Sequence, residues 1–431
     1  MLLFTKVCVK DRAPSKTNTF MMQIRLKAHT LFITVVISFI IGILCSVLLL
    51  TTYLHQSQTQ YNLVEEALIH NCRSGIHYAL AHSSVGKEEE IIDLFAKGKD
   101  SVRIKRDYWG VYELISVTAF QNNQSRTQTI LSGYPPKGDY ASALYLSDHR
   151  RPLSLTGNTL IKGKAFLPEA GVKRAYIQGQ GFTGVQLVQG SIQQSKEQLP
   201  TLNTAQQDYL TQLVSIASNQ ENEIEDTIHS FHLPTIAWQV QSKALAGVVL
   251  KGNIILRSEQ ALSIPSSCTL EQVIVIAPKI TIQSGFKGQL QCFAKDTLIV
   301  EPNVTLSYPS SLLVSSTALR SYIVLSSNST LYGHIGMIHT TQEKEAKAFL
   351  HIEQGATVYG AVYADAFVTL QGKIYGHASV NKFFLKTRTS IYENYLLNGI
   401  IDYSKLPKTH VNGSIFNNAE KNNQQVVQWV F

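Results

Sequence analysis

Hydrophobic residues follow one another without interruption near the start of the chain. Residues 31–50 read LFITVVISFIIGILCSVLLL and carry no charge. Twenty helical residues, at about 1.5 Å each, span a hydrocarbon core of about 30 Å, so the pattern predicts a transmembrane helix over 29–53. Gly42 and Ser46 form a small-xxx-small pair, as found where such helices pack together. A cleaved signal peptide is the alternative, but its apolar region is usually about 7–15 residues long and a small-residue cleavage site follows it.

After this run the hydrophobic positions recur every three or four residues, which is the period of an amphipathic helix. These positions are Tyr61, Val64, Leu68, Cys72, Ile76 and Ala79. We expect the helix to continue outward through them. Residues 101–134 are instead rich in β-branched and aromatic residues, with a polar turn at 121–124. They predict a small antiparallel sheet that ends at Pro135 and Pro136.

A nine-residue pattern recurs in the C-terminal half, with apolar residues at positions 1, 3, 7 and 9 and polar, Gly or Pro residues between them. Five copies begin at Val248, Ile274, Leu298, Ile323 and Leu350, and a sixth begins upstream at Leu153. The five starts are 26, 24, 25 and 27 residues apart. Two short strands around a turn cannot bury their apolar sides alone, so stacking of the copies about 4.8 Å apart predicts a parallel β-helix with about 25 residues per coil. A β-sandwich is the alternative, although it does not require a fixed period.

The proposed register makes two predictions about neighbours. Val300, Leu325 and Ile352 share position 3 of successive copies and should form one buried ladder. Cys268 and Cys292 each lie six residues before a copy, at 274 and 298, and should therefore be adjacent. They would form either a ladder of buried thiols or a disulfide between coils.

Two further elements are expected outside the repeats. Thr204 and Gln207 form a capping-box pattern, and the helical spacing that follows predicts a helix or helical pair over 204–231. The apolar residues 426–431 predict a terminal strand, which would pair with the last coil or be offered to a partner. The expected organisation is a basic cytoplasmic segment (1–28), a transmembrane helix (29–53), a membrane-proximal helical region (54–97), a small antiparallel β region (98–136), a first β-helix-like coil (137–190), a helical insertion (191–234), a parallel β-helix (235–390) and a C-terminal extension (391–431).

Charge gives the orientation and excludes one class of partner. The net charge is +8, but residues 1–28 hold six cations and one anion, which leaves only +3 on the rest of the chain. Nucleic-acid binding is therefore not expected. The basic flank predicts a cytoplasmic N-terminus and an extracytoplasmic C-terminal domain. Five cysteines in 431 residues exclude a disulfide-dense scaffold.

The chain offers few groups for catalysis or metal binding. Carboxylates in the repeats that could act on a polysaccharide are Glu271, Asp296, Glu301, Glu353 and Asp365. Histidines that could bind a metal are His70, His77 and His82 near the first helix, and His229 with His232 near Asp226. Solvated carboxylates and solvated helix histidines explain both sets. The sequence therefore predicts no catalytic residue, no cofactor and no metal site.

The layout from residue 20 to residue 135 resembles pilin-type and minor-pseudopilin membrane proteins. It shares with them a short basic lead, a long apolar helix, the stretch Asn71–Leu80 and then a small sheet. Lys27–Thr30 stands where that family has its cleavage signal, and the apolar run holds no Glu, so processing by a prepilin peptidase is not expected. Residues 354–380 resemble the short Gly-punctuated repeats of bactofilin-type β-helices, which supports the expected fold.

The sequence thus predicts a single-pass cell-envelope protein that presents a β-helix ectodomain. Its expected role is structural or binding, in contact with the membrane and with other envelope or pilus-like proteins, and glycan binding is compatible with it. The alternative is an envelope enzyme that acts on polysaccharide through the β-helix.

Overall fold

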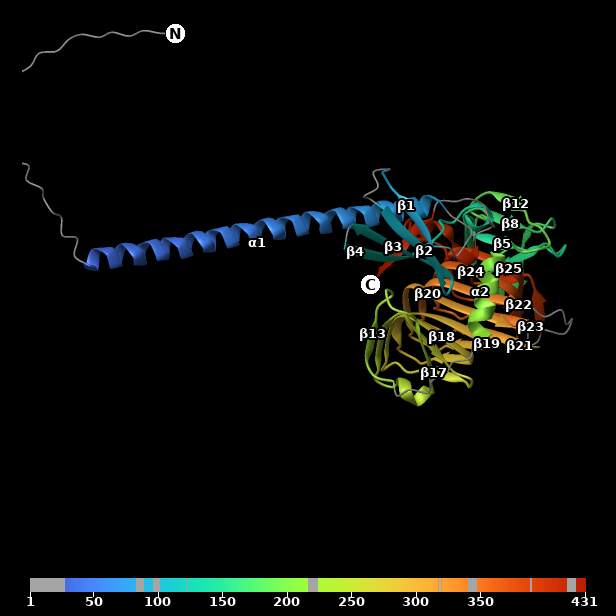
Figure 1. Ribbon diagram of the computed structural model, residues 1–431. Helices are drawn as coiled ribbons and strands as arrows, with labels where there is room; N and C mark the ends of the chain where they lie inside the picture. Colours follow the sequence, from blue (N-terminus) through green and yellow to red (C-terminus); the bar gives the residue numbers. More distant parts are fainter. Residues whose placement is uncertain are drawn as a thin grey trace, which may run out of the picture. The chain divides into compact units, whose positions relative to one another are not determined.

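The computed structural model describes residues 28–82, 89–95, 101–121, 123–215, 224–316, 318, 320–339, 347–387, 390–416 and 424–431. The basic segment predicted over 1–28 therefore lies outside the described residues, apart from Ala28. The chain is mainly β, with one long apolar helix near its N-terminus (Figure 1). It divides into two compact units, Met1–Val64 and Glu65–Phe431.

Helix α1 (Ala28–Ala81) contains the predicted apolar run without a break. Its large apolar side chains from Leu31 to Leu54 are exposed, and by length and composition this part of the helix could cross a membrane. The hydroxyls of Thr34 and Ser46 donate hydrogen bonds back to helix carbonyls, so this stretch satisfies these polar groups internally.

The C-terminal part of α1 packs on an antiparallel sheet. The predicted amphipathic positions Leu68 and Cys72 are buried there, which confirms the helical period. The side chain of Arg106 donates hydrogen bonds to the carbonyls of Ala79 and His82, and so caps the C-terminal end of the helix.

The predicted small sheet is present and has two more strands than expected. The hairpin predicted at 121–124 is confirmed, because Gln121 pairs with Gln124 in antiparallel register. The five strands, in sheet order, are β1 (Glu90–Asp93), β2 (Ser101–Trp109), β3 (Tyr112–Gln121), β4 (Gln124–Gly133) and β29 (Gln425–Val430).

Strand β29 corrects the prediction for the C-terminus. It does not pair with the last repeat but lies antiparallel to β4, with Trp429 opposite Ile130. Gln424, just before it, donates its backbone N–H to the carbonyl of Leu80 at the end of α1. The last strand of the chain therefore completes the sheet that begins near residue 90.

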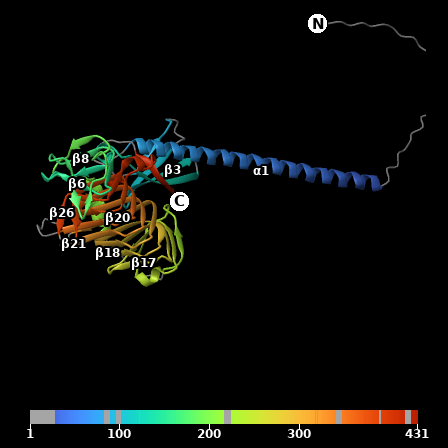
Figure 2. The ribbon, with the colours of Figure 1, turned by 180° about the vertical axis from the view of Figure 1, so that it is seen from behind.

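Almost all of the remaining strands are parallel, and most of them close into a barrel-like sheet, whereas β27, β6 and β9 form a separate three-stranded sheet and β10 and β11 a two-stranded one. Figures 1 and 2 show the parallel strands side by side, and Figure 1 labels β5 between β8 and β25, with both of which it pairs. Before α2 (Thr204–Ser215) they are β5 (Leu144–Leu146), β6 (Leu153–Thr156), β7 (Leu160–Lys162), β8 (Ala165–Leu167), β9 (Val172–Arg174) and β12 (Ile192–Gln194), with a small hairpin of β10 (Tyr176–Ile177) and β11 (Gln180–Gly181). After α2 they are β13 (Thr227–His229), β14 (Ile236–Gln239), β15 (Val249–Gly252), β16 (Ile254–Arg257), β17 (Leu262–Ile264), β18 (Thr269–Ile282), β19 (Lys287–Val300), β20 (Thr305–Ser316), β21 (Arg320–Leu325), β22 (Thr330–His339), β23 (Lys347–Ile352), β24 (Thr357–Leu370), β25 (Lys373–Lys386), β26 (Ile391–Glu393), β27 (Tyr395–Leu397) and β28 (Ile400–Asp402). Short 3-10 turns lie at Gly138–Tyr140, Ser242–Leu245, Tyr403–Lys405 and Ser414–Phe416.

Parallel pairing arranges these strands in three rows. Row 1 contains β13, β15, the first parts of β18, β19, β20, β22, β24 and β25, and then β28 and β7. Row 2 contains β14, β16, the middle or later parts of the same long strands, and then β5, β8 and β12. Row 3 contains β17, the ends of β18 and β19, β21, β23 and the ends of β24 and β25, followed through Asn394 by β27, β6 and β9.

The predicted ladder of Val300, Leu325 and Ile352 is confirmed. Val300 pairs with Leu325 and Leu325 with Ile352, and each side chain is at most 1% exposed. Row 3 continues this ladder on both sides, through Ile282 and Leu370. These apolar side chains belong to one continuous core inside the parallel strands.

The predicted uniform period is wrong for the first copies. Leu298 pairs with Ile280 and not with Ile274, whereas Leu298 and Ile323 do pair as the period requires. The reason is that all three rows carry the same alternation of apolar and polar positions. The copy that begins at Ile274 joins row 2 to row 3, whereas the copy that begins at Leu298 joins row 3 to row 1.

The same correction separates the two cysteines. Cys292 in row 2 has Val275 and Leu312 as its neighbours, whereas Cys268 immediately precedes β18. Both thiols are free and buried, and burial raises the pKa of the Cys268 thiol to about 11. The predicted adjacency of Cys268 and Cys292 is therefore wrong.

The upstream copy at Leu153 has an unexpected position in the stack. Its two strands, β6 and β7, pair with β27 and β28, so that Ser154 lies opposite Tyr395 and Leu160 lies opposite Ile400. In row 2, strand β5 likewise pairs with β25. An early part of the chain thus extends the parallel rows beyond their C-terminal strands.

The predicted helix over 204–231 is shorter than expected. Helix α2 ends at Ser215, residues 216–223 lie outside the described part of the chain, and Thr227–His229 forms strand β13 in parallel register with β15. Pairing with an existing strand overrides the weak helical pattern there. Asn203 caps the helix, because its side chain accepts the backbone N–H of Gln206.

A second apolar core joins the sheet and α2 to the outside of row 2. Trp109 and Tyr112 of the β2–β3 hairpin and Leu210 and Leu213 of α2 belong to it, together with Phe293 of β19. This core explains why row 2 is apolar on both sides, whereas an exposed strand would alternate.

Candidate functional site

Two of the five carboxylates singled out in the repeats accept hydrogen bonds from the backbone. Glu301 accepts the backbone N–H of Ser284 at 2.9 Å, and Glu353 accepts that of Ser327 at 3.0 Å. Each therefore stabilises the turn of a neighbouring strand pair.

Two more of these carboxylates lie on the outside of the strands. Glu271 forms an ion pair with Lys251 at 3.0 Å. Among the described residues, no hydrogen bond or ion pair to the side chain of Asp296 is found. The charge of Glu271 is therefore compensated by Lys251.

The histidines considered as metal ligands have other contacts. His229 bonds the carbonyl of Pro234 at 2.8 Å, and His232 lies 3.4 Å from the hydroxyl of Thr129. Asp226, the carboxylate near them, accepts a backbone N–H in β15.

The histidines of α1 lie on the helix surface. His70 and His77 are exposed, and His82 stacks on Tyr78 with the ring centroids 4.2 Å apart. Within the described ranges, no group of three His, Cys, Asp or Glu side chains could hold a metal ion.

Three other histidines of the described chain are buried where row 2 meets the second core. His334 accepts the backbone N–H of Gly413 at 3.0 Å, and His377 bonds the carbonyl of Ser142 at 2.8 Å. His410 lies beside His334, with the ring centroids 5.4 Å apart. Burial lowers the pKa of His334 well below its usual range, and it lowers the pKa values of His377 and His410 to about 4.

These histidines predict a loss of stability in mild acid. The pKa values of these histidines are lower in the folded protein than the unfolded value of about 6.5. As the pH falls, the unfolded chain therefore takes up protons before the folded protein does. The contribution of the histidines to the free energy of unfolding thus decreases between about pH 6.5 and pH 4. Between about pH 7 and pH 5, His377→Gln should lose about 2 kcal/mol less stability than the wild type does. Urea unfolding at the two pH values measures the difference.

The matched control for this prediction is His77→Gln, which removes an exposed imidazole from α1. It should leave the pH dependence as it is in the wild type. Equal pH dependence of His377→Gln and the wild type would show that the buried imidazole is not neutral in the folded state.

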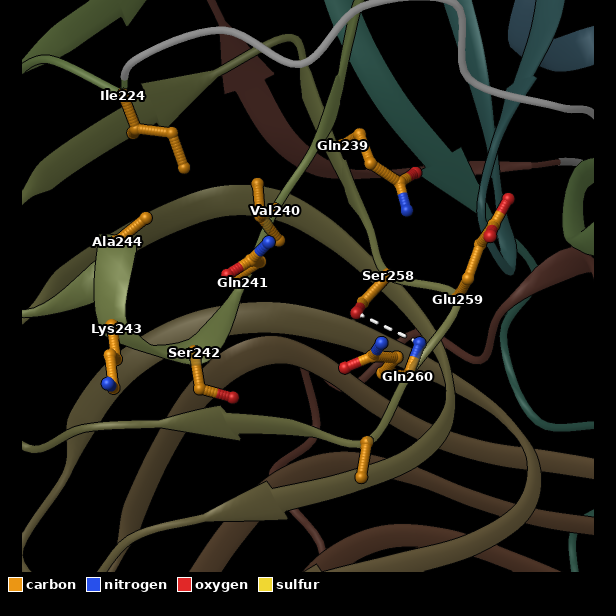
Figure 3. A pocket seen from close by; sticks show the side chains of 11 residues that line it. Ile224, Gln239, Val240, Gln241, Ser242, Lys243, Ala244, Ser258, Glu259 and Gln260 are labelled. Carbon is orange, nitrogen blue, oxygen red and sulfur yellow. Dashed lines mark hydrogen bonds between the residues drawn. The ribbon is translucent and has the colours of Figure 1, made fainter.

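One hollow lies beside the first strands of rows 2 and 3 and has a volume of about 720 Å³. Figure 3 shows its lining, which is rich in amide and hydroxyl groups from two loops, 239–244 and 258–261. The backbone N–H of Gln260 donates to the hydroxyl of Ser258 at 3.2 Å. Lys243 and Glu259 are the charged residues of this lining, so the hollow can offer hydrogen bonds but has no concentrated charge.

A second, charged cleft of about 480 Å³ lies at the junction where the early strands extend the rows. Four segments that are distant in the sequence line it: the loop 148–151 after β5, Glu197 after β12, Lys382 of β25, and residues 393–394 at the end of β26. We call it the junction cleft. It carries more charged side chains than the first hollow, so electrostatic recognition of a ligand is possible there.

Hydrogen bonds to Asp148 hold the loop 148–151 in place. Its carboxylate accepts the backbone N–H groups of Arg150 at 2.7 Å and Glu169 at 2.9 Å. These bonds favour the charged form and lower the pKa of the carboxyl group.

A second set of hydrogen bonds, made by side chains, supports the same loop. His149 bonds the side-chain oxygen of Asn381 at 2.5 Å, and Asn381 donates to Asp365 at 2.7 Å. Asp365, one of the carboxylates noted in the sequence, thus supports this loop through Asn381.

The backbone at Arg150 is strained. Its φ is +58°, in the left-handed region that a residue with a side chain seldom adopts. Strain of this kind costs of the order of 1–3 kcal/mol and is common at ligand sites. The hydrogen bonds of Asp148 hold the loop in this conformation.

An aromatic stripe runs along the outside of row 3 towards the junction cleft. Tyr322 stacks on Phe349 with centroids 5.5 Å apart, and Phe349 stacks on Phe367 at 5.7 Å. The Nζ atom of Lys382 lies 5.9 Å from the ring centroid of Phe367. Because the rings cover one another's faces, the stripe stabilises the row and presents ring edges to a ligand.

No family model, no curated protein and no solved structure matches this chain. Its function must therefore be inferred from its own residues. The junction cleft does not follow from the sequence pattern, because its segments come together only when the early strands stack on β25 and β28. The run Asp148–Arg151, with four ionisable residues in succession, is the local signal that could have indicated it.

Proposed function

We propose that this protein is a membrane-anchored, pilin-type subunit that presents a rigid parallel β-helix outside the cytoplasm. The observation that carries the proposal is that the two parts of α1 have different surroundings. Its apolar first part is exposed, and its later part packs on a small antiparallel sheet through Leu68, Cys72 and Ile76. A helix that is apolar all round is suited to a bilayer or to a bundle of similar helices.

We infer that the closed parallel strands form the β-helix. Each strand of a row pairs in parallel with a strand from the next turn of the chain, so that Ile282 pairs with Val300, Val300 with Leu325, and Leu325 with Ile352. The length of chain between partners varies along this one ladder. Such variation is what a β-helix gives when loops of different lengths are inserted at its corners, and the three rows then correspond to three faces.

Contacts between α1 helices would support assembly into a pilus-like or secretion structure. Ser38, Gly42 and Ser46 recur every four residues and line one shallow hollow of the helix. Small residues at this spacing let two helices approach closely in an apolar environment. Cys45, which is exposed and free, lies beside them and provides a native reporter.

The alternative, an envelope enzyme that acts on polysaccharide, has weaker support. Hydrolysis by paired carboxylates needs an acid and a base that face one substrate. Glu301 and Glu353 both accept backbone N–H groups in turns, and Glu271 pairs with Lys251. Their contacts are structural, so a binding role is the better proposal.

The proposal predicts the topology of the chain. A tag at Lys10 should be protected in intact cells or spheroplasts, whereas a C-terminal tag should be accessible to protease, because the basic flank stays in the cytoplasm. Accessibility of the two tags measures the result. Release of a soluble protein that begins near Tyr53 would contradict the anchor.

Assembly is tested in the same membranes. Oxidation should give crosslinked species that depend on Cys45, and Gly42→Leu should reduce them because a larger side chain separates the helices. Leu49→Ile, on an exposed part of the same helix, is the matched control and should have little effect. A product that stays monomeric, with no envelope protein copurifying, would contradict assembly.

A further inference from the structure

Four asparagines of the chain stand two residues before a serine or threonine, in the pattern N-x-S/T that is required for N-linked glycosylation. They are Asn123, Asn303, Asn328 and Asn412. An attached sugar is bulky, so an asparagine that carries one must lie on the surface of the folded protein. Burial therefore decides which of these sites can be used.

Asn303 and Asn328 occupy the same exposed turn in two neighbouring strand pairs. Each turn leads from row 3 to row 1, and the threonines that complete the two sites lie opposite each other, Thr305 against Thr330. The backbone N–H of Asn303 donates to the carbonyl of Ser327 in the next turn. At a strand spacing of about 4.8 Å the two asparagines form one surface patch, which we call the corner patch.

Asn412 has the opposite surroundings. It is 3% exposed, and its backbone N–H and C=O groups both bond to Tyr134. Its side-chain oxygen lies 3.2 Å from the Nε2 atom of His410. A sugar on the amide nitrogen would displace packed neighbours, so we expect none there in the folded protein. Asn123 is exposed, but Asn122 beside it lies outside the described residues, and no proposal is made for it.

The corner turn requires a left-handed residue but not an asparagine. The φ values of Asn303 and Asn328 are +62° and +58°, a conformation that asparagine tolerates. Gly285 and Gly355 fill the same position of the turns on either side, with φ values of +80° and +86°. Glycine can therefore replace either asparagine without backbone strain.

We propose that Asn303 and Asn328 are acceptors of an N-linked glycan. This rests on the proposed function, because it requires the parallel strands to lie outside the cytoplasm. The donor is a sugar carried on a lipid pyrophosphate. The side-chain amide nitrogen forms a bond to the anomeric carbon of the sugar, the bond from that carbon to the pyrophosphate oxygen breaks, and the amide nitrogen loses one proton.

A glycan at the corner patch would cover the edge between rows 1 and 3. Both asparagines are exposed, and within the described residues no protein group is hydrogen-bonded to either side-chain amide. Because the two turns are adjacent, a sugar on either asparagine shields the same corner and increases the solubility of the domain.

The test uses the full chain, purified in detergent from its native membranes, and analyses its peptides by mass spectrometry. The peptides that contain Asn303 and Asn328 should occur in a form that is heavier by a glycan on the asparagine. The peptide that contains Asn412 should occur only unmodified. A glycan on neither asparagine of the corner patch, or a glycan on Asn412, would overturn the proposal.

Paired substitutions test the hydroxyl requirement. Thr305→Val with Thr330→Val keeps the β-branched shape but removes both hydroxyls, and should abolish the glycan of the corner patch. Thr305→Ser with Thr330→Ser is the matched control and should retain it. Asn303→Gly with Asn328→Gly should also lose the glycan, with an unchanged circular dichroism spectrum. A glycan that persists in the valine variant would contradict the assignment.

A C-terminal tag in the same cells separates this proposal from the proposed function. If the tag is accessible from outside and the corner patch carries no sugar, the glycan proposal fails and the topology stands. If the tag is protected and the corner patch carries no sugar, both fail.

Discussion

Leu325→Asp should unfold the parallel strands or destabilise them by at least about 4 kcal/mol. Leu325 is fully buried between Val300 and Ile352 in row 3, so the new carboxylate would have no partner in an apolar core. Urea unfolding followed by circular dichroism measures the loss.

The control for this change is the preceding residue on the same strand. Val324 points away from the core and is half-buried, and Val324→Asp should cost about 1 kcal/mol or less. A Leu325→Asp variant that is as stable as Val324→Asp would show that the register of β21 is wrong.

Gly360→Ala should cost at least about 3 kcal/mol. The φ of Gly360 is +146°, and an added Cβ atom would collide with the carbonyl oxygen of Gly333 on the neighbouring strand. Gly333, Gly360 and Gly376 pair with one another in a single line across β22, β24 and β25, and all three have a similar positive φ. The strands can approach closely there only because these residues have no side chain.

Gly138→Ala separates the cost of the left-handed backbone from the cost of a collision with the neighbouring strand. Gly138 also has a left-handed φ, of +58°, but a Cβ atom there would meet nothing within 4 Å. The change should cost about 1–2 kcal/mol, from the backbone alone. Thermal and urea unfolding should therefore show a clearly larger loss of stability for Gly360→Ala than for Gly138→Ala. Equal losses of stability would show that the close approach of the strands at Gly360 adds no cost.

Local patterns predict the elements of this chain well. The apolar run and the three-to-four residue period predict α1, and the polar turn at 121–124 predicts the β3–β4 hairpin. The position of Leu325 in a buried ladder also follows from the alternation along its strand. In each case the signal depends on neighbours that are close in the sequence.

Longer-range features are not predictable in this way. The three rows share one alternation, so the pattern cannot show which corner a copy belongs to, and for that reason it wrongly places Cys268 beside Cys292. The partner of β29 cannot be predicted locally, because pairing with β4 depends on tertiary contacts. The junction cleft requires the stacking of β5 and β7 on strands near the other end of the chain.

The stacking of early strands on late ones also governs when the protein can fold during synthesis. Leu144 pairs with Ala378, and Thr129 of β4 pairs with Val430, the second-last residue of the chain. Both contacts have a very large sequence separation, which slows folding and keeps strand edges open until the partner arrives. Neither the small sheet nor the end of the parallel rows can therefore be complete before these late strands have been synthesised. A product truncated before β29 would leave β4 as the edge strand of the small sheet, and its free backbone N–H and C=O groups could then pair with another chain.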